Sequence, residues 1–173
     1  MNSSSTSYFV NLAQATDTDA ITALLQANSP SRGGSLTGEF SRDKVAGMAN
    51  GASPVIVARR MADGPVVGVL FSAAPATVQA SVILAMLAAY AASDNAYVSG
   101  PVCIAESERG QGLLALLYAA MREQHGGAEA VLFIRRDNPG SLRAHERLGM
   151  REVAAFVFDG AQFAVYSDAI AAK

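Results

Sequence analysis

The chain has 173 residues, of which 51% are hydrophobic and 16% are charged, and its formal net charge is −2. A chain of this length and apolar content can bury one full core, so we expect a single domain over 1–173 and no extended disorder. The nearly balanced charge argues against the basic surface that nucleic-acid binding needs, so we expect no nucleic-acid partner.

The N-terminal segment and the single cysteine bear on the cellular compartment. Residues 1–7 lack a charged region followed by an apolar core, so we expect a flexible tail there and no secretory signal. Cys103 is the only cysteine and cannot form an internal disulfide or a metal cluster, which indicates a reducing compartment and no metal. The cytoplasm is therefore the expected location.

In chain order, the first third predicts a strand, two helices and a hairpin. A strand over 8–15 leads into a helix at whose start Thr16 and Asp19 resemble a capping pair. A loop rich in Gly and Ser over 29–40 precedes a short helix over 41–49. The β-branched runs SPVIVARR and PVVGVLFS, joined by MADG, predict a hairpin with an Asp-Gly turn.

The most apolar segment, residues 80–92, is too short to cross a bilayer, which takes roughly 20 residues. Its apolar residues recur at helical spacing, with Val82, Met86 and Tyr90 in one series. We expect a helix that is buried either in the core or against a second subunit. No membrane association is expected, and a homodimer is a candidate assembly.

The last part of the chain alternates strands and helices. Strands are expected over 97–104 and 130–136, and helices over 110–124 and 139–148. A second hairpin follows, in which REVAAFVF and AQFAVYS flank an Asp159-Gly160 turn. The complete order predicts a mixed α/β sheet with helices on both faces.

The stretch ESERGQGLLALL places Gly110 and Gly112 between a strand and a helix. A helix start exposes unpaired N–H groups, and glycines let a bulky anion approach them, so the stretch could seat a pyrophosphate. It lacks the Gly-Lys-Ser/Thr end of a P-loop and the three-glycine spacing of NAD-binding folds. A tight connection that binds nothing is the alternative.

The strand ahead of this stretch contains Gly100-Pro101, and proline cannot donate to a strand ladder. A bulge there would let the strand splay from its neighbour. The N–H and C=O groups around Val102, Cys103 and Ile104 would then be free to pair with an extended ligand. A bulged edge strand without a ligand remains the alternative.

A second stretch, RRDNPGSLRAHERLGM, predicts a helix with a chemically useful face. Asn138 can cap this helix, because proline follows it at the first helical position. Three-to-four spacing puts Asn138, Ser141 or Leu142, and His145 on one face. That face points back toward the preceding strand end.

The two stretches, in this order and one strand apart, resemble the motifs of the GNAT superfamily of N-acetyltransferases. The family's Gln/Arg-x-x-Gly-x-Gly/Ala motif stands here as RGQGLL (109–114), with Leu114 in place of its last glycine or alanine. The motif Asn-x-x-Ser/Ala-x-x-x-Tyr/His-x-x-Leu-Gly-Phe stands as residues 138–150. The resemblance implies a mixed, mostly antiparallel α/β (α+β) sheet with splayed strands and helices on both faces.

The resemblance also implies that acetyl-CoA binds between the splayed strands as the acyl donor. The strand backbone would pair with its pantetheine arm, the loop amides would hold its pyrophosphate, and the capped helix would contact the arm from the other side. The cofactor-binding residues expected on this basis are Val102, Cys103, Ile104, Arg109, Gly110, Gln111, Gly112, Leu113, Leu114, Asn138 and Ser141.

Acetyl transfer needs a neutral amine, a polarised thioester and a proton for the departing thiolate. His145 stands where a family tyrosine often supplies that proton, so it is the candidate general acid, with local packing as the alternative. Glu106 is the candidate base, and Glu108 lies beside it, although a solvated turn carboxylate would explain each. Cys103 lacks an activating partner and is expected in the core.

The leading hypothesis is an N-acetyltransferase that moves an acetyl group from acetyl-CoA to a primary amine of a small molecule or protein by direct attack. A catalytically silent acyl-CoA-binding module and a dimeric interaction protein are the alternatives. The 29–40 loop and the 75–95 segment lie where family members often shape the acceptor pocket. Neither contains a pattern that selects an acceptor.

Overall fold

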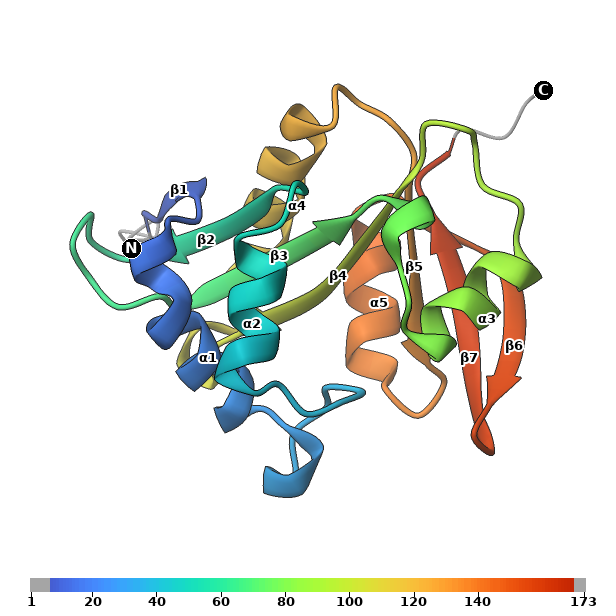
Figure 1. Cartoon of the computed structure of the whole chain (residues 1–173), viewed down its shortest axis with the longest axis horizontal. Coiled ribbons are helices and arrows are strands. Elements are labelled where there is room, and N and C mark those ends of the chain that lie inside the picture. The colour runs from blue at the N-terminus through green and yellow to red at the C-terminus, as the bar shows by residue number, and fades with distance from the viewer. Residues whose placement is uncertain (1–6, 170–173) are drawn as a thin grey trace, which may run out of the picture. The chain divides into compact units, whose positions relative to one another are not determined.

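The computed structural model describes residues 7–169, so all but the last residue of the tail predicted over 1–7 lies outside the described residues. Within this range, seven strands form one sheet in the order β1-β2-β3-β4-β5-β7-β6 (Figure 1). Five α-helices connect the strands along the chain, except that β2 leads directly to β3 and β6 leads directly to β7. The strands are β1 (Phe9–Leu12), β2 (Val55–Arg59), β3 (Gly68–Ala73), β4 (Tyr97–Ile104), β5 (Ala130–Arg135), β6 (Arg151–Phe158) and β7 (Ala161–Ser167). The helices are α1 (Thr18–Ala27), α2 (Arg42–Ala49), α3 (Ser81–Ala89), α4 (Leu113–Gln124) and α5 (Pro139–Arg147).

Strand pairing makes the sheet mixed and mostly antiparallel, as predicted. The pairs β1–β2, β2–β3, β5–β7 and β6–β7 are antiparallel, and the pair β4–β5 is parallel. Parallel neighbours need a long crossover connection, and here that connection contains α4. Each predicted strand and helix is present, although β1 is shorter than the 8–15 predicted.

Contacts within the chain group its residues into two compact units, and β4 passes from one unit into the other. The first unit contains the chain up to Ser72 and Pro101–Gln124, and the second contains Ala73–Gly100 and the chain from His125 onward. The boundary within β4 falls between Gly100 and Pro101, at the interruption that the sequence indicates. The single domain over 1–173 stays a prediction.

In the first unit, helices cover both faces of the strands. Alternate residues of a strand face opposite sides, so Gly68 and Val69 of β3 belong to different faces. Val69 is buried in an apolar cluster with α1 and α2, which lie side by side in Figure 1, whereas a Cβ on Gly68 would lie 3.1 Å from Leu113 of α4. The cluster consists of Ile21, Leu24, Leu25, Phe40, Val45, Val55, Val57, Val66, Val69, Phe71 and Cys103.

The start of α1 differs from the prediction. The Asp17 carboxylate accepts a hydrogen bond from the backbone N–H of Gln14 at 2.9 Å, in a short 3-10 turn ahead of the helix. The predicted capping pair, Thr16 and Asp19, is therefore wrong, and the Asp19 carboxylate instead accepts from an arginine of α2 at 2.6 Å. Gln14 and Asp17 have the same spacing as the predicted pair, but Asp17 also binds Arg59 of β2, which favours this register.

Both predicted hairpins are confirmed, and they turn in different ways. Asp159 and Gly160, between β6 and β7, have φ angles of 47° and 73°, and a two-residue type I′ turn requires positive φ at both positions. The strands β2 and β3 instead connect through residues 60–67, a longer loop than the predicted turn. Gly64 closes a local turn inside this loop, where its N–H donates to the Met61 carbonyl at 2.9 Å.

The segment predicted as an apolar helix over 80–92 forms α3 and packs in the core of the second unit. Met86 is fully buried against Val98, Val131 and Val165, and α3 lies beside β6 (Figure 1). The buried side of α3 is thus covered by its own chain. Within residues 7–169, no helix is long and apolar enough to span a membrane.

Helices cover both faces of the second unit's strands as well. Val165 of β7 packs in the α3 cluster, and the next residue, Tyr166, faces the opposite side of the sheet. There the Tyr166 hydroxyl donates to the Glu146 carboxylate of α5 at 2.9 Å. The predicted sheet with helices on both faces is therefore confirmed.

A buried carboxylate joins three segments of the second unit. Glu129, which precedes β5, is buried, and its carboxylate accepts from Tyr90 Oη at 3.0 Å and from Ser167 Oγ at 2.5 Å. It also accepts from the backbone N–H of Ser93 at 2.7 Å and from the Ser93 hydroxyl at 2.5 Å. Burial raises the pKa of Glu129, but the hydrogen bonds from Ser167, Ser93 and Tyr90 outweigh it, and the pKa is lowered.

We expect Glu129→Leu to reduce the free energy of unfolding by about 2–4 kcal/mol, because it leaves several donors without their acceptor. Because the folded-state pKa of Glu129 is lowered, its charged form stabilises the fold above the unfolded-state pKa. That contribution disappears as the pH falls through the folded-state pKa. Urea unfolding of wild type and Glu129→Gln from pH 7 down to pH 3 should therefore show a shrinking stability difference.

The exposed Glu123 of α4 offers a matched control, since Glu123→Gln makes the same chemical change outside the network. We expect Glu123→Gln to follow the wild-type stability at every pH. A wild-type pH dependence that persists in Glu129→Gln would contradict the role of Glu129.

Candidate functional site

Strand β4 is continuous from Tyr97 to Ile104, and the irregular backbone predicted at Gly100-Pro101 lies within it. Gly100 has a φ angle of 127°, which favours glycine, and Pro101 has no N–H to donate. The parallel pairing of β4 with β5 joins Tyr97 to Ala130 and Val98 to Val131, and both pairs precede Gly100. The geometry is that of a ladder that stops where the two strands were predicted to splay.

The glycine loop after β4 has open space beside both of its glycines. Gly110 and Gly112 have φ angles of 74° and 79°, and a Cβ built on either would meet no heavy atom within 4 Å. The positive φ angles cannot belong to an α-helix, so α4 begins at Leu113 and not at residue 110 as predicted. The loop therefore presents backbone, without side chains, at the start of a helix.

The first two residues of α4 differ in how far their side chains are buried, and both carry amides at the start of the helix. Leu113 is buried, and its side chain lies against Gly68, so only its amide is suited to a ligand. Leu114, which replaces a small residue of the family motif, is half-buried. Both residues lie in the first helical turn, where N–H groups have no partner within the helix.

Polar side chains within the loop fix its backbone. The Arg109 guanidinium donates to Asn28 Oδ1 at 2.5 Å and to the Ile104 carbonyl at 3.3 Å. The Gln111 side-chain amide donates to the Ser107 carbonyl at 3.0 Å. Asn28, which follows α1, was not predicted as a site residue, since its partner lies 81 residues away and no local pattern links the two.

The two candidate bases differ sharply in their surroundings. Glu106 is exposed, as expected of a solvated turn carboxylate. Glu108 is buried, and its carboxylate accepts from Arg60 Nε at 2.8 Å and from the Tyr8 hydroxyl at 2.7 Å. The bonds from Arg60 and Tyr8 lower the pKa of Glu108, which makes it a weak proton acceptor. Sequence reasoning placed Glu108 near the site but missed both partners.

Cys103 lies in the core of the first unit, as predicted. Its side chain is 5% exposed, and its thiol donates to the Leu24 carbonyl at 3.7 Å. Burial raises the pKa of the thiol to about 11, so it stays protonated at neutral pH. A thiolate nucleophile at this position is therefore disfavoured, and only the Cys103 backbone is suited to a ligand.

Asn138 caps α5, as predicted. Its side-chain oxygen accepts from the backbone N–H of Ser141 at 3.1 Å, and proline follows it at the first helical position. The cap occupies the oxygen of the Asn138 amide group and directs this side chain at the helix start. Asn138, Ser141 and His145 belong to the second unit, whereas the predicted residues of β4 and the glycine loop belong to the first.

His145 is held in one tautomer by α5. It is 5% exposed, and its Nδ1 lies 2.8 Å from the Ser141 carbonyl oxygen and 3.4 Å from Ser141 Oγ. A bond to a carbonyl oxygen requires a proton on Nδ1, so the neutral ring carries its lone pair on Nε2. Burial lowers the pKa of His145 more than the Ser141 carbonyl raises it. The ring is therefore uncharged at neutral pH.

The loop over 29–40, predicted to shape an acceptor pocket, is ordered by its own contacts. The Glu39 carboxylate accepts from the backbone N–H of Ser31 at 2.9 Å, and this bond lowers its pKa. A Cβ on Gly34 would lie 1.9 Å from the Asn28 carbonyl oxygen, so this close approach requires glycine. The role of the loop in acceptor binding stays a prediction.

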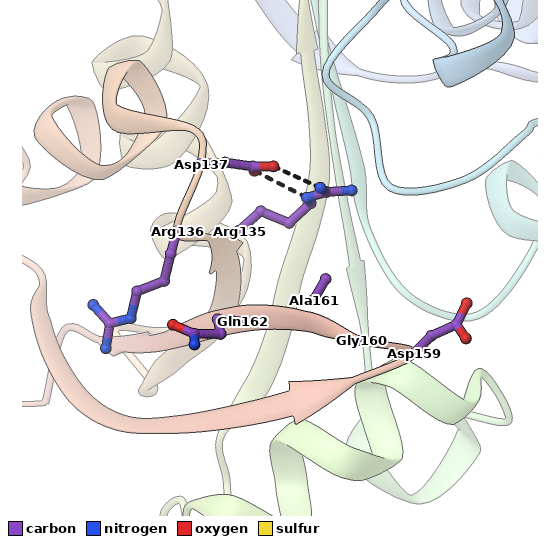
Figure 2. A pocket seen from close by; sticks show the side chains of 7 residues that line it. All are labelled: Arg135, Arg136, Asp137, Asp159, Gly160, Ala161 and Gln162. Carbon is purple, nitrogen blue, oxygen red and sulfur yellow. Dashed lines mark hydrogen bonds and ion pairs between the residues drawn. The ribbon is translucent and has the colours of Figure 1, made fainter.

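A hollow of mixed charge lies in the second unit, at the end of β5. Figure 2 shows the Asp137 carboxylate against the Arg135 guanidinium, while Arg136 extends in another direction; the bonds from Arg135 are 2.6 and 3.0 Å long. Each arginine is paired, since Arg136 binds Glu152 of β6. The hollow is lined by Arg135, Arg136, Asp137, Asp159, Gly160, Ala161 and Gln162. Sequence reasoning did not single out these residues.

The charged side chains do not gather into a metal centre. Within residues 7–169, no group of three or more His, Cys, Asp and Glu side chains is placed to hold a metal ion. The chemical features of the described residues are therefore the open glycine loop, the irregular strand β4 and the capped helix α5.

No family model matches the chain, and no curated protein matches it either. Solved structures do. The chain is similar to the structure of yncA from Salmonella typhimurium with its cofactor acetyl-CoA, at 17% identity and a TM-score of 0.69, covering 96% of this chain and 98% of that one. It is also similar to an N-acetyltransferase from Staphylococcus aureus Mu50, at 16% identity and a TM-score of 0.66, covering 93% of this chain and 97% of that one. A third similar structure is an acetyltransferase of the GNAT family from Streptococcus pneumoniae, at 11% identity and a TM-score of 0.65, covering 93% of this chain and 98% of that one. The fold is therefore that of the GNAT N-acetyltransferases, over nearly the whole chain.

Proposed function

We propose that this chain is an N-acetyltransferase that moves the acetyl group of acetyl-CoA to a primary amine by direct attack. One observation carries the proposal: the open backbone at Gly110 and Gly112 leads into α4, shortly after a strand whose pairing with β5 stops before Gly100. This arrangement occurs in a fold shared with yncA, whose structure contains acetyl-CoA.

The residues present suit the parts of acetyl-CoA. A helix start with exposed N–H groups favours an anion, and the amides of 109–114 would hold the pyrophosphate. The backbone of 102–104 would pair with the pantetheine arm as an added strand does, and Asn138 and Ser141 would contact the arm from α5. When bound, acetyl-CoA supplies the thioester carbon at which the amine attacks.

Two of the candidate proton-transfer groups, His145 and Glu108, are restrained by their hydrogen-bond partners. His145 donates from Nδ1 to a backbone carbonyl and is uncharged at neutral pH, so it has no proton to give from Nε2. Glu108 is bound by Arg60 and Tyr8. Glu106 stays the candidate base on position alone. These observations favour positioning over acid–base catalysis, and they also favour the second candidate function, a catalytically silent acyl-CoA-binding module.

Assembly and location stay predictions. The buried side of α3 is covered by its own chain, so a homodimer is not needed to cover it, although Leu84 of α3 is 47% exposed. The cytoplasmic location, and the expected absence of nucleic-acid and membrane partners, rest on the sequence.

We expect Gly112→Ala to weaken CoA binding by about tenfold or more, because the new Cβ would enter the open space above the loop. The positive φ angle at Gly112 should also reduce the free energy of unfolding by about 1–2 kcal/mol. Gly126→Ala is the matched control, since Gly126 has a φ angle of 60° and equally open surroundings but lies after α4. Calorimetry with CoA and urea unfolding measure the two effects.

Gly126→Ala should lose similar stability and keep wild-type affinity for CoA. Equal affinity losses in the two variants would indicate that the glycines serve only the turn. A thiol-release assay over a panel of small-molecule and peptide amines then tests transfer, and buried Cys103 should not consume the thiol reagent. CoA binding without release above background for any amine would favour the silent module.

We expect His145→Asn to retain turnover within about threefold, whereas loss of a true proton donor would cost about 100-fold or more. Asparagine can still donate from its amide to the Ser141 carbonyl, so it preserves the contact and removes the titrating ring. The measurement is kcat against pH from 5.5 to 9. Burial lowers the pKa of His145, so if His145 donated the proton, kcat would fall as the pH rises through this lowered pKa.

His145→Phe serves as the comparison, because it keeps a ring and removes the donor to Ser141. We expect it to lose stability along with activity. A large loss of kcat in His145→Asn, together with a wild-type kcat that falls as the pH rises, would instead establish His145 as the general acid.

A further inference from the structure

The residue immediately before the glycine loop is anchored from two distant segments. Glu108 is 4% exposed and ends the short 3-10 turn that precedes Arg109. One of its carboxylate oxygens accepts from Arg60 Nε at 2.8 Å, and the other accepts from the Tyr8 hydroxyl at 2.7 Å. Arg60 follows β2 and Tyr8 precedes β1, so the loop is tied to both strands.

The three side chains form a closed group. The Arg60 guanidinium carbon lies 5.9 Å from the centre of the Tyr8 ring, so the two partners of Glu108 also face each other. The Glu108 side chain is 5% exposed and the Arg60 side chain 49%, so the carboxylate is the buried end of the pair. A buried carboxylate that loses its cation is strongly disfavoured, which ties the position of Glu108 to Arg60.

The anchoring extends into the loop itself. The Tyr8 hydroxyl lies 3.5 Å from Gln111 Oε1, and the Gln111 amide donates to the carbonyl of Ser107 at 3.0 Å. Gly110 and Gly112 meanwhile have open space where side chains would be. Side chains therefore fix the loop through hydrogen bonds, while its two glycines leave the backbone bare for an anion.

We infer that Tyr8, Arg60 and Glu108 are positioning residues that hold the glycine loop in its ligand-binding shape before any ligand arrives. The inference rests on the proposed function, because the ligand in question is the pyrophosphate of CoA. Glycines at positive φ lose much conformational freedom on ordering, so a loop that is already ordered binds more tightly. None of the three residues belongs to the motif that identified the loop.

A neighbouring ion pair supplies the control. Arg59, next to Arg60 in sequence, binds Asp17 at the start of α1, and both side chains are largely buried, at 14% and 12% exposure. This pair lies in the same unit, and within residues 7–169 neither Asp17 nor Arg59 hydrogen-bonds to the loop. Arg59→Met and Arg60→Met therefore remove equivalent charges with different consequences for the loop.

The test compares these variants by hydrogen exchange without ligand, by calorimetry with CoA, and by steady-state kinetics. We expect Arg60→Met to speed exchange of the Glu108 and Arg109 amides, which are hydrogen-bonded at the start of the loop. We also expect it to raise both the Kd for CoA and the KM for acetyl-CoA by about tenfold. The kcat should change by less than about threefold, since the chemistry itself is untouched. Arg59→Met should leave loop exchange, Kd and KM at wild-type values while lowering stability.

Tyr8→Phe removes one hydroxyl and keeps the ring, so it tests the same idea if Arg60→Met fails to fold. Faster loop exchange and weaker CoA binding in Tyr8→Phe would support the inference. Equal changes in Arg59→Met and Arg60→Met would overturn it, and so would weaker binding with unchanged exchange. Exchange in the free protein reports on the loop, whereas CoA binding by wild type reports on the proposed function, so the two can fail separately.

Discussion

The irregular backbone of β4 at Gly100 and Pro101 constrains everything that follows it in the chain. A φ angle of 127° at Gly100 favours glycine, and Pro101 cannot donate a ladder hydrogen bond, so β4 pairs with β5 through Tyr97 and Val98, ahead of these two residues. The boundary between the two compact units falls between the same two residues. Polar backbone beyond the paired residues needs partners, and an extended ligand can provide them.

The loop after β4 combines flexible glycines with hydrogen bonds that hold it in place. Gly110 and Gly112 leave the backbone bare, which suits an anion but costs conformational entropy when the loop is ordered. Hydrogen bonds from Arg109 to Asn28, and from Arg60 and Tyr8 to Glu108, offset that cost within the first unit. The polar side chains around the loop therefore serve its shape, and its backbone is left for recognition.

Sequence reasoning succeeded where the signal was local. The cap at Asn138 depends on a neighbouring proline, and the Asp159-Gly160 turn depends on two adjacent residues, so α5, β6 and β7 begin where they were predicted. It failed where distant partners decide. Asp17 gains Arg59, which favours a cap two residues before the predicted pair, and Glu108 gains partners 48 and 100 residues away. A window of ten or twenty residues contains neither.

Three side chains in or near the two motifs have the chemistry to move protons or acyl groups, and each is restrained. Cys103 is buried with a raised pKa, Glu108 is ion-paired with a lowered pKa, and His145 is neutral with Nδ1 bound to a carbonyl. Catalysis by such a site would depend on holding a neutral amine in line with the thioester, and positioning of this kind can lower a reaction barrier by about 7–11 kcal/mol. An active transferase and a silent binding module would then share the same acetyl-CoA-binding residues. They would differ in whether the remaining residues hold an amine close to the thioester.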